Sequence, residues 1–116
     1  MIEEIVRNYL ISETNTPTWL EFPKDAQERF IVLEVVDRDK QGHIDAVTIE
    51  FNSYAESKQE AILLDKEVRK AMENIIEDDR ISGCYFGGGS SGDNNDEEMK
   101  RYCYRCYFNI FYYEED

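Results

Sequence analysis

A glycine-rich segment near residue 90 has the residue types and spacing closest to a nucleotide-binding loop. Gly87, Gly89 and Gly92 stand at the G-x-G-x-x-G spacing that brings backbone close to a pyrophosphate where a helix begins. Four acidic residues follow between positions 93 and 98, and their carboxylates would repel a phosphate. No Gly-Lys-Ser or Gly-Lys-Thr is present. We therefore interpret residues 87–96 as a flexible hairpin loop.

The end of the same segment has a weak likeness to a calcium-binding loop. Oxygen-bearing side chains stand at alternate positions from Asp93 to Glu97. The glycine that such a loop needs at its sharp turn is replaced by Glu98, and the closing bidentate glutamate by Tyr104. We predict no calcium site here.

The cysteines could serve a metal or a redox reaction. Cys103 and Cys106 have C-x-x-C spacing, which needs a turn or a helix start to bring both thiols together. On a strand, residues three apart point to opposite faces, and no second C-x-x-C is present. We expect these two residues and Cys84 to be free thiols, with no metal and no cofactor.

The sequence also shows no arrangement of residues that is typical of a catalytic site. His43 is the single histidine, and no serine or cysteine stands in an activating motif beside it. The carboxylates are many but dispersed, and nothing marks a pair held close in an apolar cleft. We predict that the protein is not an enzyme.

Composition limits the partners. The chain of 116 residues is long enough for one domain, residues 1–116, and has 26 acidic against 13 basic residues, a formal charge of −13. This charge argues against binding of nucleic acid or anionic membrane and favours basic protein surfaces. The N-terminus lacks the pattern of a signal peptide, no membrane span is visible, and three cysteines suit a reducing compartment. We expect a cytoplasmic protein.

Two helices are predicted from helical spacing of apolar residues, over residues 2–12 and 57–76. The second begins with a capping box, Ser57 to Glu60. Its solvent face is expected to carry Asp65, Arg69 and Glu73. Its buried stripe is expected to be Ala61, Leu64, Val68, Ala71, Met72 and Ile75.

Five strands complete the prediction. They are expected over residues 18–22, 29–36, 47–51, 80–86 and 100–113. Pro23 suits an edge position for the first strand, and residues 37–42 form a polar hairpin turn. The order α-β-β-β-α-β-β predicts an α+β fold, a mostly antiparallel sheet of about four to five strands with two helices packed on one face.

The last strand is unusual because both of its faces carry large apolar side chains. One face has Tyr102, Tyr104, Cys106, Phe108, Ile110 and Tyr112. The other has Cys103, Arg105, Tyr107, Asn109, Phe111 and Tyr113. Either this strand is central, or helices cover one face and a partner covers part of the other. Because tyrosine joins apolar area to a polar tip, Tyr107, Phe111 and Tyr113 are candidate subunit-interface residues.

Several short segments stand in an order that is familiar from one family. They are Trp-Leu-Glu-Phe-Pro-Lys at 19–24, Phe-Ile-Val-Leu-Glu at 30–34, Ile-Asp-Ala-Val-Thr-Ile at 44–49, Asn-Ser-Tyr-Ala at 52–55, and Lys-Arg-Tyr at 100–102. Over residues 2–113 the chain resembles the tail-terminator (tail-completion, head–tail joining) proteins of long-tailed phages and prophages.

This resemblance implies an α+β subunit that forms a hexameric ring on the end of the tail tube. The ring would stop tube polymerisation and meet the head connector, with the tail-tube protein and further copies of itself as partners. It implies no catalytic residues and no direct contact with nucleic acid. The protein would be cytoplasmic during assembly and part of the virion tail afterwards.

A second class remains open, an acidic binding module or DNA mimic that inhibits a host nucleic-acid-binding protein. Such a protein should order its carboxylates in one clear stripe. In the sequence the charge is spread over a helix, a turn and a loop, which favours the structural subunit.

Overall fold

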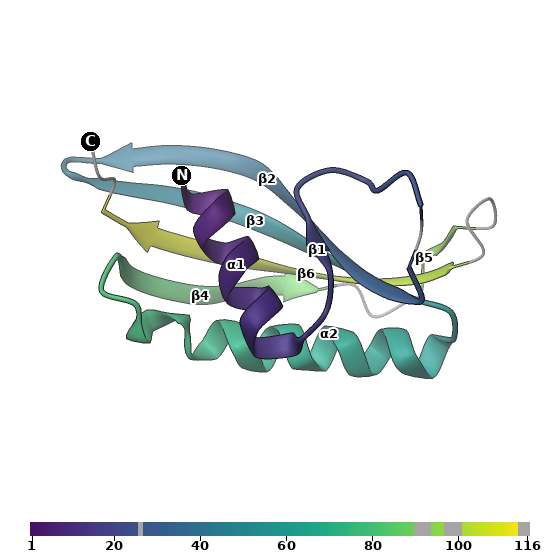
Figure 1. Cartoon of the computed structure of the whole chain (residues 1–116). Coiled ribbons are helices and arrows are strands. Elements are labelled where there is room, and N and C mark those ends of the chain that lie inside the picture. Colours follow the sequence, from purple (N-terminus) through teal and green to yellow (C-terminus); the bar gives the residue numbers. More distant parts are fainter. Residues whose placement is uncertain (26, 90–93, 97–100, 114–116) are drawn as a thin grey trace.

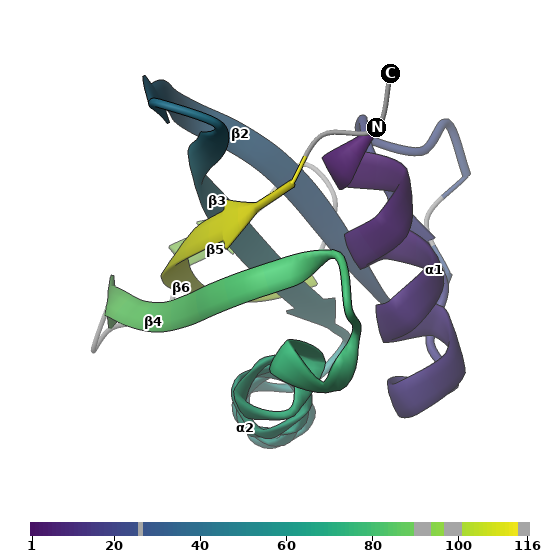
Figure 2. The same cartoon turned by 90° about the vertical axis from the view of Figure 1, so that its left-hand side faces the viewer.

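The computed structural model describes residues 1–25, 27–89, 94–96 and 101–113. In this part of the chain two α-helices lie on one side of a curved sheet, and no helix lies on the other side (Figures 1 and 2). The predicted α+β class and the order α-β-β-β-α-β-β are confirmed. None of the helices in these ranges has both the length and the apolar character needed to cross a bilayer.

The sheet has the strand order β1-β2-β3-β6-β4, and a short sixth strand, β5, pairs with one end of β6. The strands are β1 Thr18–Trp19, β2 Arg29–Gln41, β3 Ile44–Ala55, β4 Ile81–Gly89, β5 Asn94–Asp96 and β6 Arg101–Tyr112. Only the pair β1–β2 among these is parallel. The aromatic strand β6 is therefore central, between β3 and β4, and it is also covered by helices on one face.

The β2–β3 hairpin is longer than the sequence predicts. Residues 37–42 were expected to form a turn, but β2 continues to Gln41 and pairs with Ile44. The turn is confined to Gly42 and His43, and Gly42 has the positive φ of +66° that favours glycine. The prediction was wrong because the hairpin end is exposed to solvent, so its residues lack the apolar alternation that marks a half-buried strand.

A β-bulge in β2 changes which side chains face the helices. The pairing passes from Val35 opposite Ile49 directly to Asp37 opposite Thr48, so Val36 is the extra residue. Beyond the bulge, Arg38 lies on the helix side, where it forms an ion pair of 2.5 Å with Glu3. Asp37 and Asp39 consequently lie on the opposite face.

Two other strand predictions need correction. The expected strand 18–22 is reduced to Thr18–Trp19, because the chain then leaves β2 and crosses toward Arg29; its edge position is confirmed. The expected loop 87–96 is wrong at both ends, since residues 87–89 belong to β4 and residues 94–96 form β5. The fourth strand accordingly runs past Phe86 to Gly89 because Tyr107 and Cys106 of β6 offer partners. Residues 90–93 lie outside the described ranges.

The helices are α1 Ile2–Thr14 and α2 Lys58–Glu73, followed by a 3₁₀ turn, η1 Ile75–Glu77. The Ser57 hydroxyl accepts a hydrogen bond of 3.2 Å from the Glu60 backbone N–H, as the capping box predicts. The whole predicted stripe of α2 is buried.

One residue of the predicted solvent face of α2 is not in solvent. Asp65 is only 6% exposed and pairs with Arg69 at 2.9 Å. The prediction was wrong because Arg69, one turn later, gives this carboxylate a partner beneath the sheet.

Candidate interaction face of the sheet

We define the open face as the side of β2, β3, β6 and β4 that no helix covers. Along each strand every second side chain points to it, and the register aligns these side chains in rows across the sheet. One end of this side is covered by the chain that precedes β2: Phe22 contacts Tyr54 edge-on at 5.3 Å, and Tyr54 stacks on Phe30 at 4.9 Å. In the described ranges no other helix or strand layer covers the rest of the open face.

The central row has a carboxylate at one end and an aromatic ring at the other. Across the four strands it reads Asp37, Thr48, Asn109 and Tyr85. The Thr48 hydroxyl donates to the Asn109 side-chain oxygen at 2.7 Å, which links the two middle residues. Tyr85 is 61% exposed, and Asp37 has no hydrogen-bond or ion-pair partner in the part of the chain that the structure describes.

The next row also has a carboxylate on β2, but its aromatic ring stands on β6 and its β4 residue is a glycine. It reads Asp39, Ala46, Phe111 and Gly83. A Cβ atom at Gly83 would come within 2.9 Å of Cε2 of Tyr85, so glycine here lets that ring lean over the strand. The rings of Tyr85 and Phe111 meet edge-on with centroids 5.9 Å apart. Together the two rows line a hollow of about 460 Å³ with carboxylates on the β2 rim and aromatic rings on the β4 side.

Beside the hollow lies a hydrogen-bonded polar cluster. Arg105 Nε donates to the Asn52 side-chain oxygen at 2.6 Å, and Asn52 Nδ2 donates to Glu50 at 2.9 Å. Arg105 also lies 3.9 Å from Glu50, and a hydrogen bond to Glu50 raises the pKa of Tyr107. The cluster thus occupies the Arg105 guanidinium. Arg101, on the same side of β6, donates to the Gln27 carbonyl at 3.1 and 3.0 Å.

This face also has an excess of negative charge. Glu34 and Glu50 stand directly opposite each other on β2 and β3, a like-charge pairing that destabilises a sheet. With Asp37 and Asp39, four carboxylates of the open-face positions on β2 and β3 stand against Arg101 and Arg105 of β6, which leaves two negative charges in excess. A cationic partner would relieve this repulsion.

The structure places the three candidate interface residues in two different locations. Tyr107 and Phe111 are half-buried on the open face, as the alternation of the last strand predicts. Tyr113 follows the end of β6, donates its backbone N–H to Arg80, and lines a separate hollow beside α1.

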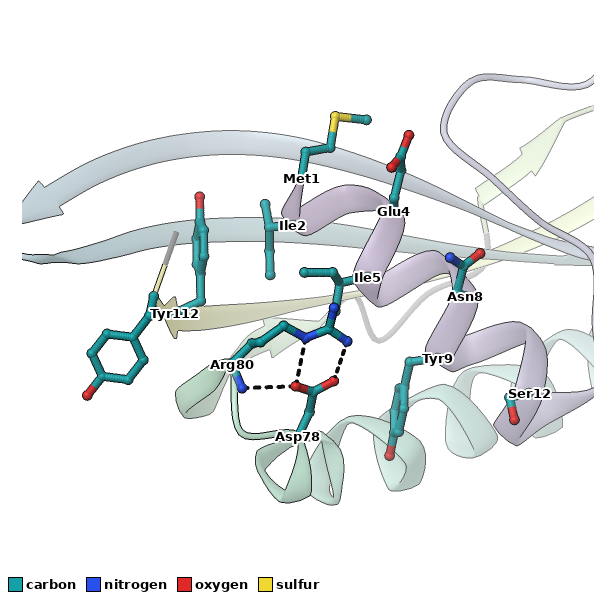
Figure 3. Close-up of a pocket in the computed structure, with 11 residues that line it drawn as sticks. Met1, Ile2, Glu4, Ile5, Asn8, Tyr9, Ser12, Asp78, Arg80 and Tyr112 are labelled. Carbon is teal, nitrogen blue, oxygen red and sulfur yellow. Dashed lines mark hydrogen bonds and ion pairs between the residues drawn. The ribbon is translucent and has the colours of Figure 1, made fainter. Parts of the chain in front are cut away.

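That second hollow is larger, about 770 Å³, and lies between the N-terminal half of α1 and the start of β4. Figure 3 shows two of its charged groups joined to each other: the Arg80 guanidinium donates to both carboxylate oxygens of Asp78, at 3.0 and 2.7 Å. This pairing lowers the pKa of Asp78 to about 2. Tyr9 donates to the Ala71 carbonyl at 2.5 Å, and burial is the main cause that raises its pKa to about 12. Arg80 and Asp78 thus bind each other and Tyr9 binds the backbone of α2, which makes this hollow the weaker candidate for a ligand.

The residues considered for metal or redox chemistry are not assembled. Cys103 and Cys106 are both buried and lie on opposite faces of β6, and all three cysteines are free. Burial raises the pKa of Cys84 to about 11 and that of Cys106 to about 12, so the thiols stay protonated and unreactive. In the described ranges no group of three or more His, Cys, Asp or Glu side chains could hold a metal ion. His43 is exposed at the hairpin turn.

The sequence predicted the β6 side chains of the hollow, but not Tyr85 of β4 or the two carboxylates of β2. The alternation of β6 placed Tyr107, Asn109 and Phe111 on one face. Asp37 and Asp39 were assigned to a turn, and only the bulge at Val36 brings them to this face. No family model and no curated protein matches the chain.

Proposed function

We propose that this protein is a structural subunit that works by binding other proteins, and that it terminates the tail tube of a long-tailed phage or prophage. It would form a ring with copies of itself on the end of the tube and offer a surface to the head connector. The resemblance of residues 2–113 to tail-terminator proteins names this class, and the α+β fold agrees with it.

The observation that carries the proposal is the open face. One face of the sheet carries no helix in the described ranges, and its most prominent side chains are Tyr85, exposed at 61%, with the half-buried Tyr107 and Phe111. Aromatic residues beside polar groups are enriched at protein interfaces. These rings give the open face apolar surface that a protein partner could bury.

Charge supports the same reading. A ring that encloses passing DNA should not bind phosphates, and a subunit with a net charge of −13 repels them. Heterologous contacts between subunits close into a ring only at a fixed rotation, so the tail end can act as the template for assembly.

The test is deletion of the coding sequence in the phage or prophage that carries it. The induced lysate is then compared with that of the complemented strain by electron microscopy. Overlong tail tubes together with tailless heads are expected, and complementation should restore uniform tails. Normal virions after the deletion would end the proposal.

One observation favours the second candidate, an acidic module that mimics DNA. Four carboxylates lie on the open face, ordered by the β2–β3 register, although the sequence suggested that charge was dispersed. A DNA mimic would bind a host nucleic-acid-binding protein in competition with DNA. The deletion would then leave virions normal, whereas the structural subunit requires defective tails.

A further inference from the structure

We propose that the hollow on the open face binds an extended basic segment of a partner protein, with arginine as its preferred cationic residue. This inference rests on the proposed function in one respect only, since it names the chemistry of the partner that the open face would bind.

The carboxylate rim supplies the first part of the site. Asp37 and Asp39 stand two residues apart on β2, so they point to the same face about 7 Å from each other along the strand. An extended segment with cationic residues at alternate positions repeats this spacing. Asp39 accepts only a short-range bond from the Lys40 backbone N–H, at 2.7 Å, and Asp37 has no partner in the described chain.

The aromatic side supplies the second part. Tyr85 and Phe111 lie edge-on to each other at 5.9 Å and border the same hollow as the two carboxylates. A guanidinium is attracted by the face of an aromatic ring and lies flat on it, while its carbons cover apolar surface. Between the two sides the floor is formed by Ala46, Thr48 and Asn109, none of which is charged, and the Thr48 hydroxyl donates to the Asn109 side-chain oxygen.

The alternatives fit this hollow less well. Phosphates would meet carboxylates, and the absence of a third ligand beside Asp37 and Asp39 in the described residues disfavours a metal ion. A second copy of this chain would bring further negative charge, because each copy carries −13. The charge and the aromatic rings together select an organic cation.

The probe for the test is a fluorescently labelled Gly-Arg-Gly-Arg-Gly peptide, and its control replaces each arginine by citrulline, which has nearly the same shape without the charge. Binding is measured by fluorescence anisotropy at physiological ionic strength, and contacts are mapped through backbone amide shifts in nuclear magnetic resonance spectra. The arginine peptide should bind and the citrulline peptide should not. Shift changes should centre on Asp37, Thr48, Tyr85, Asn109 and Phe111.

Matched double variants separate this site from general attraction to an acidic protein. Asp37→Asn with Asp39→Asn should weaken binding about tenfold, since two exposed ion pairs are lost. Glu73→Gln with Asp79→Asn removes the same charge from exposed residues away from the hollow and should change affinity less than about twofold. Tyr85→Leu, which keeps apolar volume and removes the ring, should weaken binding about threefold. Circular dichroism confirms that each variant is folded.

Equal losses in the two double variants, or amide shifts centred away from the open face, would overturn the inference. So would equal binding of the citrulline peptide. The result is separable from the tail function: specific binding with normal virions after deletion would retain the site and reject the tail terminator. Defective tails without specific peptide binding would do the reverse.

Discussion

The two faces of the sheet differ in what covers them. On the helix side, side chains of β2, β3 and β6 pack against α1 and α2, and Ile49, Phe51 and Ile110 are fully buried. On the open side the same strands present carboxylates, a hydrogen-bonded Thr48–Asn109 pair and aromatic rings, and these side chains are half-buried or exposed. The comparison indicates that the first face specifies the fold and that the second is free to specify a partner.

The largest expected effect lies on the helix side. Leu64→Ala should lower the free energy of unfolding by about 2–4 kcal/mol, because Leu64 is fully buried and its loss leaves a cavity. Lys66→Ala, exposed on the same helix, should stay within about 0.5 kcal/mol. Urea unfolding measures both. Similar losses at the two positions would show that the buried side of α2 is assigned wrongly.

A smaller effect on the free energy of unfolding is expected at the N-terminus of α2. Ser57→Ala should lower the free energy of unfolding by about 1 kcal/mol, because the Glu60 backbone N–H loses its side-chain acceptor. Ser57→Asp keeps an acceptor and should preserve most of the stability. If alanine and aspartate behaved alike in thermal unfolding, the cap would have no energetic role.

The buried carboxyl of Asp65 makes the free energy of unfolding depend on pH. Burial, only partly offset by Arg69, raises the pKa of this carboxyl in the folded protein above its unfolded value. The stability gained from its protonated form is therefore full below the unfolded pKa and is lost as the pH rises through the raised folded pKa.

Asp65→Asn removes this titration. The wild type should lose stability relative to the variant as the pH rises through that window, measured by urea unfolding at a series of pH values. A difference between the two proteins that stayed constant with pH would contradict the assignment.

The smallest effect on stability is expected on the open face. Tyr85→Ser should change the free energy of unfolding by about 0.5 kcal/mol or less, because the ring is 61% exposed and its main contact is Phe111. A loss comparable to that of Leu64→Ala in the same urea assay would mean that the ring stabilises the fold rather than awaiting a partner.

The sequence predicts those parts of the fold and of the open face that follow from a periodic pattern within one helix or strand. The α2 stripe and the alternation of β6 are periodic patterns of apolar residues, and both predict the correct faces. We found no pattern in the sequence that predicts the bulge at Val36, yet this bulge determines on which face of the sheet Asp37 and Asp39 lie. Asp65 was placed in solvent because its burial depends on a partner one turn away. The open-face hollow depends on register between four strands, which a single sequence does not specify.

We propose that the open face, rather than the helix layer, contacts the partner. Tyr85 and Leu63 are both large exposed apolar residues, 61% and 50% exposed, one on the open face and one on α2. Tyr85→Lys and Leu63→Lys change charge equally, so each is used to complement the deletion strain and tail lengths are measured by electron microscopy. If the open face contacts the partner, Leu63→Lys should restore uniform tails and Tyr85→Lys should leave overlong tubes. Restoration by Tyr85→Lys, with failure of Leu63→Lys, would contradict it.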